Sequence, residues 1–534
     1  MRYAVTSALV GALLLATAQG GGAVASTTTQ ETVTSAPDQP QEATASADVR
    51  PRIAPTTSPL GDVRNGTLPE RGPLAQQISE EMGSSWLGPT NRRSIAVRDA
   101  LTGESLADRH SDRPVTPAST TKLLSAAAII TALDPATTFT TQVVAGQEPG
   151  EVIIVAGGDM LLADGEGDPE GVAGHAGIAD LAAQTAAALR AGARDAGAGE
   201  DETGEAGTGV SATGGAGDDE VGPVTVSLDL SHVPGPHALD TWSGHWVAEG
   251  WTGRIVQLGR AQDRALPFNP SPQEPEHEVA RVFRAALAGQ GIDVVGTGEE
   301  GGGSNDNAGN DGNDDVDGNG DDGDDDEVRA AVVTAPADAE QLAVVESAAL
   351  RDVLALALAT SDNAMFEQLA RQGAAAAGHG ADQASVTAWI HEVMVEEFGL
   401  DLTAMRLVDA SGLSDGTRLS MEVVADVLVA GADGSHPALQ EVLAAGGLPI
   451  AGYTGTLGNG MRFHLPVHAP AVGTARAKTG TLPGVTALAG TVVSADGRLL
   501  VFAVAADDIE TGSAAIEAAS VLDEIVAELA RCGC

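Results

Sequence analysis

The chain begins with an apolar run and continues with a long polar stretch that has no periodicity. Residues 4–18 are mostly apolar, follow a single Arg2, and lead to small residues that end in Ala23-Val24-Ala25. The run is short for a membrane span and has the order of a secretory signal peptide, which predicts a signal peptide over residues 1–25, with an uncleaved anchor as the alternative. Residues 26–75 are rich in Thr, Ser, Pro, Gln and Gly, which predicts a disordered linker.

From about residue 74 the pattern alternates between strand and helix periods. Residues 95–100 predict a strand that returns over residues 104–108 after a Thr102-Gly103 turn. An apolar helix is predicted from Ser119 to about Leu133. Further strands are predicted at 151–155, 224–228 and 292–295, and further helices at 176–191 and 276–290.

The last third of the chain has helical patterns first and then a hairpin. Helices are predicted from Ser347 to about residue 359 and at 383–397, 420–432 and 513–531, with strands at 472–478, 485–493 and 498–505. The last two strands meet across Ala495-Asp496-Gly497, a strong turn signal. This order predicts a protein of mixed helices and strands (α/β in the broad sense, α+β by class), in which helices cover an antiparallel sheet.

Composition and charge narrow the classes of function. The 75 acidic residues against 28 Lys and Arg give a formal net charge of −47. This excludes a nucleic-acid-binding protein, for which a basic surface is expected, and it disfavours docking on anionic lipid. Membrane contact is therefore expected at most through the N-terminal segment. Two Gly-rich acidic tracts, at about residues 193–222 and 297–328, have few large apolar residues and are predicted to be disordered loops.

The only two cysteines, Cys532 and Cys534, end the chain. A pair at this place is not a disulfide framework for a fold. A frayed tail, with two exposed thiols or an oxidised pair, is favoured over a redox centre.

The first candidate for chemistry is Ser119-Thr120-Thr121-Lys122. Ser119 starts a predicted helix, where the helix dipole favours negative charge, and Lys122 lies on the same face one turn later. A neutral lysine can take the serine proton, and burial together with a second cation, for which Lys478 is the candidate, would lower its pKa. An isolated pattern of this kind is usually an N-cap serine with a surface lysine. Here Lys122 opens an apolar run that is predicted to be buried, and a cation at that position needs a reason.

The second candidate is Ser361-Asp362-Asn363, which follows the apolar helix. The Ser361 hydroxyl can pass a proton between Lys122 and a leaving amine, and the Asn363 amide can hold Lys122 and a substrate carbonyl. Asp362 is predicted to be structural or exposed. Alone, such a sequence is common in loops and caps.

The third candidate is Lys478-Thr479-Gly480-Thr481, on a predicted edge strand. Lys478 and the Thr479 hydroxyl can bind a substrate carboxylate. Gly480 is expected to let substrate approach the backbone, and the Thr481 N–H can point with the Ser119 N–H at an oxyanion. A Lys-Thr-Gly turn is the alternative, and the Pro483-Gly484 turn and hairpin that follow favour the strand.

The ordered triple is typical of class A β-lactamases and penicillin-binding proteins. The chain resembles the low-molecular-mass class C penicillin-binding proteins, the D-alanyl-D-alanine carboxypeptidase/endopeptidase family (peptidase family S13). Residues 113–123 resemble the family's nucleophile segment, and Gly157-Gly158-Asp159 its Gly-rich turn. Residues 409–414 resemble its Asp-Gly-Ser-Gly-Leu-Ser element, with Ala410 in place of the usual Gly.

The spacing also matches this family better than the β-lactamases. The long gap from Ser119 to Ser361 resembles the family habit of inserting domains there, whereas class A β-lactamases have a much shorter gap. No Glu-x-x-Leu-Asn element, where a β-lactamase carries its deacylating Glu, follows Asn363.

The resemblance implies a β-lactamase/transpeptidase-like catalytic domain made of residues 76–155 and 336–534, with one or more inserted domains over 156–335. It implies an exported, extracytoplasmic enzyme in which Ser119 attacks the bond between two terminal D-alanines of a peptidoglycan stem peptide, or a D-Ala–diaminopimelate cross-link. β-Lactams are expected to acylate the same serine, and no metal or organic cofactor is implied. The oligomeric state is left open.

Three alternatives accompany this interpretation. A class A-like β-lactamase and a catalytically inactive cell-wall-binding protein would share the fold. A calcium site is the third, because residues 315–320 fit the opening of an EF-hand loop with Asp326 at its twelfth position. Asp322 stands where such loops bury an apolar residue, which favours a chance match. His232, His237 and His245 share a segment with Trp242 and Trp246, where packing is favoured over a surface groove for glycan or peptide.

Overall fold

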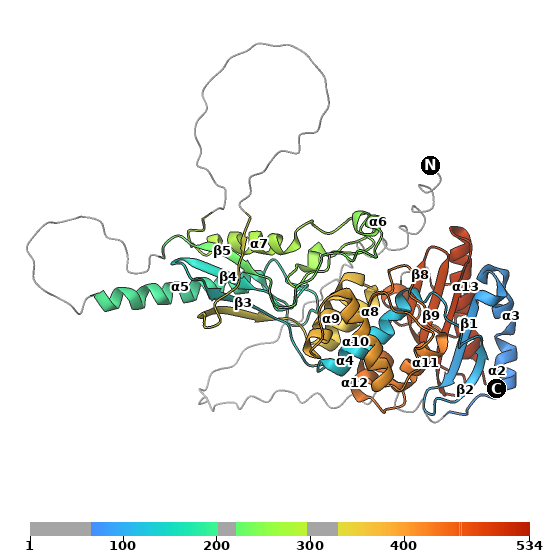
Figure 1. Cartoon of the computed structure of the whole chain (residues 1–534). Helices are drawn as coiled ribbons and strands as arrows, with labels where there is room; N and C mark the ends of the chain where they lie inside the picture. The colour runs from blue at the N-terminus through green and yellow to red at the C-terminus, as the bar shows by residue number, and fades with distance from the viewer. Residues whose placement is uncertain (1–65, 201–220, 296–328, 459, 461, 534) are drawn as a thin grey trace, which may run out of the picture.

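A computed structural model describes residues 66–200, 221–295, 329–458, 460 and 462–533 (Figure 1). The predicted signal peptide, most of the predicted linker, the EF-hand-like tract and the greater part of both acidic tracts lie outside the described residues. In the described part of the chain, no helix is both long and apolar enough to cross a membrane.

The first of two sheets has five strands in the order β2-β1-β10-β9-β8, and every neighbouring pair is antiparallel. Its strands are β1 (Arg93–Asp99), β2 (Ser105–Arg109), β8 (Ala475–Leu482), β9 (Val485–Val493) and β10 (Leu499–Asp507). The two predicted hairpins are confirmed, and β8 lies at the edge three residues further along the chain than predicted. The third candidate motif therefore belongs to an edge strand.

Both faces of this sheet are covered, and β10 shows how. Leu500, Phe502 and Val504 contact one core, whereas Val501 and Ala503 contact the other, because successive side chains point to opposite faces. The first core is closed by α2 (Arg71–Gln77), α3 (Ser79–Gly83) and α13 (Ser513–Arg531), and the second by α4 (Lys122–Ala132) and α11 (Met421–Ala430). In Figure 1, α2, α3 and α13 lie at the outer side of the sheet.

Behind this second face lies a layer of helices around α4. It contains α8 (Leu350–Thr360), α9 (Asn363–Ala376) and α10 (Gln383–Glu396). Every residue of α4 from its first position to Ile130 is buried, which identifies it as the central helix of the domain. The prediction that Lys122 opens a buried helix is confirmed.

The second sheet forms a separate unit with its own core. Its order is β6-β5-β4-β3-β7, with β3 (Thr140–Ala145), β4 (Glu151–Val155), β5 (Thr225–Asp229), β6 (Ala331–Val332) and β7 (Gln341–Glu346). Two helices, α5 (Ile178–Glu200) and α7 (Pro275–Gly289), pack on it through apolar side chains such as Leu181 and Phe283. In Figure 1 this unit and the first sheet lie on opposite sides of the central helices.

The remaining elements are short. They are α6 (Gly244–Ala248), α12 (Pro437–Leu439), a π-helical turn at Gln440–Gly446, and 3-10 turns at Ser85–Leu87, Thr90–Arg92, Ala118–Thr121, Ala261–Asp263, Gly455–Leu457 and Pro466–His468.

Several predicted boundaries differ from the structure. β3, β4 and β7 fall inside ranges assigned to the catalytic domain but belong to the second sheet, so the inserted unit begins near residue 140 and ends near 346. Periodicity identifies a strand but not the sheet it joins. α2 begins within the predicted linker, and Leu74 is fully buried there. α5 continues to Glu200, into the predicted first loop, and residues 292–295 make only a bridge from Val294 to Val224.

The end of the chain agrees with the oxidised alternative of the prediction, but Cys532 is buried and not part of a frayed tail. Cys532 is 1% exposed, packs in the core beneath α13, and is disulfide-bonded. Its carbonyl accepts a hydrogen bond from the Ala495 N–H in the hairpin turn at 3.0 Å. The end of α13 is thus fixed to the first sheet.

A buried ion pair ties α13 to the loop before β8 and gives a stability prediction. The Arg462 guanidinium donates to both oxygens of Asp523 at 2.6–3.0 Å, and the two side chains are 7% and 1% exposed. Asp523→Ala would leave a buried, unpaired guanidinium, so we expect the free energy of unfolding to fall by about 3–5 kcal/mol. Denaturant unfolding measures this change. Glu517→Ala, an exposed site on the same helix, should stay within about 0.5 kcal/mol of the wild type; equal effects of the two substitutions would contradict the prediction.

Candidate active site

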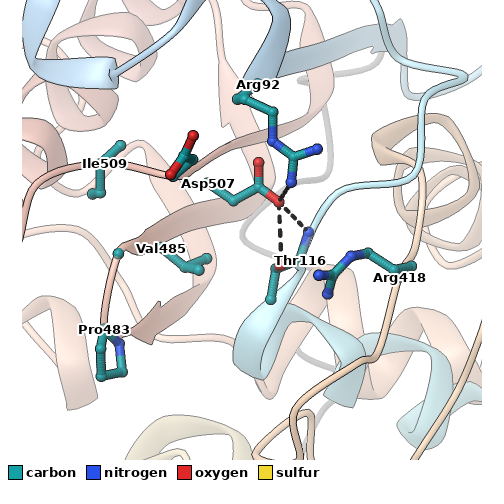
Figure 2. A pocket seen from close by; sticks show the side chains of 9 residues that line it. Arg92, Thr116, Arg418, Pro483, Val485, Asp507 and Ile509 are labelled. Carbon is teal, nitrogen blue, oxygen red and sulfur yellow. Dashed lines mark hydrogen bonds and ion pairs between the residues drawn. The ribbon is translucent and has the colours of Figure 1, made fainter.

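Ser119 lies in the 3-10 turn Ala118–Thr121 that leads directly into α4. The turn closes on itself, because the Thr120 and Thr121 hydroxyls each donate to a carbonyl three residues back at 2.8 Å. Its approach is fixed as well. The Thr116 N–H and hydroxyl donate to Asp507 Oδ2 at 3.0 and 3.1 Å, and Arg92 pairs with the same oxygen (Figure 2). The half-buried Ser119 hydroxyl is thus presented by a turn that is held on both sides.

Lys122 lies one turn further on and is fully buried. Its Nζ lies 3.1 Å from Ser119 Oγ, 2.6 Å from Asn363 Oδ1 and 2.7 Å from the Ser411 carbonyl oxygen. The ring of Phe366 lies below it, with Nζ 5.5 Å from the ring centre. The structure therefore brings together the first two motifs, which are 241 residues apart.

The electrostatics of Lys122 bring its pKa close enough to physiological pH for a fraction of the amine to be neutral. Burial lowers the pKa of Lys122 to about 8, against the opposing effect of the carboxylates of Asp409, Glu367 and Asp362. The second cation acts on Lys478 instead, because burial and then repulsion by Lys122 hold the pKa of Lys478 well below its ordinary value.

The Ser361–Asn363 motif forms the turn between α8 and α9. Ser361 ends α8 in the left-handed conformation, with φ 58°. Asp362 then caps α9 by accepting the Met365 N–H at 2.9 Å, which confirms its predicted structural role. The turn points the Ser361 and Asn363 side chains at different lysines, Lys478 and Lys122.

Lys478 extends from β8 toward this turn. Its Nζ donates to Ser361 Oγ at 2.7 Å and to the Thr479 carbonyl at 3.0 Å, and the side chain is fully buried. The Thr479 hydroxyl donates to Thr456 Oγ1 at 3.0 Å. The Thr481 side chain, two positions on, is exposed. Lys478 thus contacts the Ser361–Asn363 turn, whereas the Thr479 hydroxyl contacts Thr456.

Gly480 has a packing role that the sequence did not indicate. A Cβ at this position would lie 2.6 Å from the Pro117 carbonyl oxygen and 3.3 Å from Cβ of Ala118. The absent side chain therefore lets the Ser119 turn pack directly on β8. Sequence alone could not show this, because the neighbour of Gly480 is the nucleophile segment itself.

Two supports of Lys122 were missed or only partly seen from sequence. In the sequence, residues 409–414 were identified only by their resemblance to a family element. In the structure, the Ser411 carbonyl oxygen accepts a hydrogen bond from Lys122. Glu367 on α9 accepts the Ser411 N–H at 2.8 Å and is fully buried, and burial followed by repulsion from Asp409 raises the pKa of Glu367 to about 8. The sequence does contain an indication of this role. Glu367 lies one turn after Asn363, and an acidic residue on a buried helix face is unusual.

Asp409 orders the same element. Its oxygens accept the N–H groups of Gly412 and Ser414 at 2.6 and 2.7 Å, and Trp242 of the inserted unit donates its indole N–H at 3.1 Å. Trp242 is 6% exposed, which agrees with the favoured packing role. Gly412, with φ 76°, lies against the Ala118 carbonyl, where a Cβ would approach to 2.1 Å.

This arrangement can transfer a proton from Ser119. A neutral Lys122 has two N–H groups, and Asn363 Oδ1 and the Ser411 carbonyl can accept both. Its lone pair is then left facing Ser119 Oγ. The geometry fits a serine nucleophile whose base is lysine.

A cavity of about 470 Å³ lies next to this site, but none of the predicted site residues lines it. Figure 2 shows Arg92, Thr116, Arg418, Val485 and Asp507 around it. Among the described residues, no group of three or more His, Cys, Asp or Glu side chains could hold a metal ion.

A serine beside a buried lysine, with a second serine hydrogen-bonded to a second buried lysine, defines a serine–lysine acyl-transfer enzyme. The chain belongs to the D-Ala-D-Ala carboxypeptidase 3 (S13) family, whose sequence pattern matches residues 74–197 and 325–529.

Two curated relatives extend over most of the chain. A carboxypeptidase of Mycobacterium tuberculosis is 30% identical over 450 residues, which cover 82% of this chain and 80% of that protein. Carboxypeptidase DacB of Mycolicibacterium smegmatis is 29% identical over 503 residues, covering 91% and 90%.

The fold matches a solved structure as well. The crystal structure of penicillin binding protein 4 from Haemophilus influenzae aligns with a TM-score of 0.58 at 16% identity, covering 83% of this chain and 98% of that one. The predicted fold class, a β-lactamase/transpeptidase-like domain of the α+β kind, is confirmed.

The packing of Gly480 gives a prediction. Gly480→Ala places a methyl group against the Pro117 carbonyl, so we expect a loss of about 1–3 kcal/mol in unfolding free energy and faster hydrogen exchange over residues 116–122. Gly72→Ala is the control, because a methyl group there meets nothing within 4 Å and favours helix. Unchanged stability and exchange in Gly480→Ala would show that the Ser119 turn does not rest on β8.

Proposed function

We propose that the protein is a serine-type D-alanyl-D-alanine carboxypeptidase/endopeptidase that acts on peptidoglycan stem peptides through an acyl-enzyme on Ser119. The observation that carries this proposal is the position of Lys122 Nζ, buried and 3.1 Å from Ser119 Oγ, with two further acceptors at 2.6 and 2.7 Å. Membership of the family and the carboxypeptidase relatives support the substrate class.

Acylation begins with the proton of Ser119. Lys122 takes this proton as Ser119 Oγ attacks the carbonyl carbon of the penultimate D-alanine. The terminal carboxylate of the substrate binds Lys478 and the Thr479 hydroxyl, and the backbone N–H groups of Ser119 and Thr481 stabilise the oxyanion. A bound carboxylate also favours the charged form of Lys478, whose pKa is lowered in the free protein by burial and by Lys122.

Departure of the leaving amine needs a proton. Ser361 lies 2.7 Å from Lys478 Nζ, in the same turn as Asn363, which contacts Lys122. Its hydroxyl relays the proton that Lys122 took from Ser119 to the nitrogen of the leaving D-alanine or of the cross-linked strand, which returns Lys122 to its neutral form. Water then attacks the acyl-enzyme and Lys122 acts as base again.

The same site accounts for inhibition by β-lactams, which present a strained amide and a carboxylate to Ser119 and Lys478. In the described part of the chain, no carboxylate is hydrogen-bonded to Ser119 or Lys122, which favours a long-lived penicilloyl-enzyme over β-lactamase turnover. Export by the N-terminal segment would place the enzyme with its substrate outside the cytoplasm, and the reaction requires no cofactor.

A labelling experiment tests the nucleophile. Fluorescent penicillin should label the purified mature protein once per chain, and Ser119→Ala should remove labelling while circular dichroism stays unchanged. Ser79→Ala, at an exposed serine on α3, should be labelled like the wild type. Equal labelling of Ser119→Ala would rule out the acyl-enzyme on this residue, and rapid release of hydrolysed penicillin would assign a β-lactamase.

The pH dependence tests the base. Since the pKa of Lys122 is lowered by burial to about 8, the neutral form is scarce below that pH and dominant above it. The acylation rate constant at saturating penicillin should rise about tenfold per pH unit up to about pH 8 and then level off. Stopped-flow fluorescence measures it. A profile that is flat between pH 6 and 9 would exclude Lys122 as the titrating base.

A further inference from the structure

We propose that Arg264, a residue of the inserted unit, is a positioning residue that holds the Ser361–Asn363 turn in its reactive geometry. Arg264 Nε and Nη2 donate to Asp362 Oδ2 at 3.1 and 2.9 Å, and Nη2 also donates to Thr360 Oγ1 at 2.9 Å. One guanidinium therefore binds the residues on both sides of Ser361. The inference rests on the proposed function and names a residue outside the three motifs.

The turn needs such a support because its backbone is unfavourable. Ser361 has φ 58°, a left-handed conformation that costs a non-glycine residue free energy and persists only where its surroundings hold it. Helix α8 ends at Thr360 and α9 begins at Asn363, so the turn has little chain in which to absorb a displacement. A small shift of Asp362 therefore moves both neighbours.

Asp362 divides its two oxygens between the helix and the inserted unit. Oδ1 accepts the Met365 N–H at 2.9 Å and so starts α9, while Oδ2 accepts Arg264. The two side chains of this pair are 13% and 22% exposed, so the bond is largely shielded from water and is charge-assisted. The cap fixes the direction of α9, and the arginine fixes the carboxylate that makes the cap.

Both lysines of the site contact this turn. Asn363 Oδ1 lies 2.6 Å from Lys122 Nζ, and Ser361 Oγ lies 2.7 Å from Lys478 Nζ. Displacement of the turn would lengthen both contacts, remove one of the acceptors that orient the Lys122 amine, and misplace the hydroxyl that passes the proton. The expected loss lies in the chemical step and not in binding.

Arg264 is itself fixed by a neighbouring cluster. Arg260, four residues earlier, is 6% exposed and donates to Asp263 at 2.7 Å through two nitrogens and to Asp164 at 3.1 Å. The 3-10 turn Ala261–Asp263 lies between the two arginines. The segment that carries Arg264 is thus fixed within the inserted unit. Arg264 can therefore hold the Ser361–Asn363 turn at a defined position.

The Arg264–Asp362 pair also affects the electrostatic environment of Lys122, the proposed base. The carboxylate of Asp362 raises the pKa of Lys122, as do Asp409 and Glu367, whereas burial lowers it. Removal of Arg264 would leave Asp362 without its positive partner. The pKa of Lys122 should then rise, and the pH profile should move to higher pH.

The test compares Arg264→Met and Arg264→Lys with Arg254→Met in the full mature protein. Arg254 is a half-buried arginine of the same segment, and its side chain donates to the Pro272 carbonyl at 3.0 Å, within the inserted unit. The measurements are the acylation rate constant at saturating fluorescent penicillin, the concentration that half-saturates it, the pH profile and the melting temperature.

We expect Arg264→Met to slow acylation about 10- to 100-fold, since a charge-assisted hydrogen bond to a partly buried carboxylate is lost. The penicillin concentration that half-saturates the rate should change little. The ascending limb of the pH profile should move to higher pH. Arg264→Lys, which keeps the charge but not the fork, should recover part of the rate. Arg254→Met should acylate as the wild type does.

Three outcomes overturn the proposal. They are a wild-type acylation rate constant in Arg264→Met, an equal decrease of that rate constant in Arg254→Met, and an effect of Arg264→Met on the half-saturating penicillin concentration alone. If Arg264→Met fails to fold, Arg264→Lys and Asp362→Asn decide. Each should slow acylation, but Arg264→Lys keeps the charge and should leave the pH profile close to that of the wild type, whereas Asp362→Asn removes a carboxylate that raises the pKa of Lys122 and should move the profile to lower pH. Wild-type acylation by both variants would overturn the proposal. Failure of the wild type to label at Ser119 would refute the proposed function instead.

Discussion

The burial of Lys122 is the constraint on which the rest of the catalytic domain depends. An isolated ammonium in a core is strongly unfavourable, yet this side chain is fully buried at the start of the central helix. The structure compensates with three oxygen partners from three different segments and with the ring of Phe366. Burial lowers the pKa of Lys122, and Asp409, Glu367 and Asp362 oppose the shift, so that the value stays at about 8.

The oxygen partners of Lys122 are held in place by different sets of contacts. The Ser119 turn packs on β8 where Gly480 has no side chain, and on the Asp409–Ser414 element where Gly412 has none. The Ser411 carbonyl is oriented by the Glu367 carboxyl, which accepts the Ser411 N–H. Two glycines and one buried acid therefore let three backbone segments approach closely enough to share one amine.

The inserted unit takes part in this arrangement although its sheet and core are separate. Trp242 donates to Asp409, beside the Ser411 acceptor, and Arg264 binds Asp362, beside the Asn363 acceptor. Both residues lie between β5 and α7, outside the regular elements that build the second core. The insertion thus reaches each of the two elements, Asp409–Ser414 and Ser361–Asn363, that hold the base.

The sequence by itself determined the local elements and the chemistry of the site. Turn signals between short apolar runs identified the hairpins of the first sheet, the apolar run after Lys122 identified α4, and the ordered motifs identified the residues that meet at the site. These features depend on neighbours in the chain, which a sequence displays directly. Only the tertiary structure decided which sheet β3 and β4 join, why Gly480 lacks a side chain, and how Glu367 and Arg264 support the site. Those facts depend on segments up to hundreds of residues apart, and the pairing of distant surfaces leaves no local pattern.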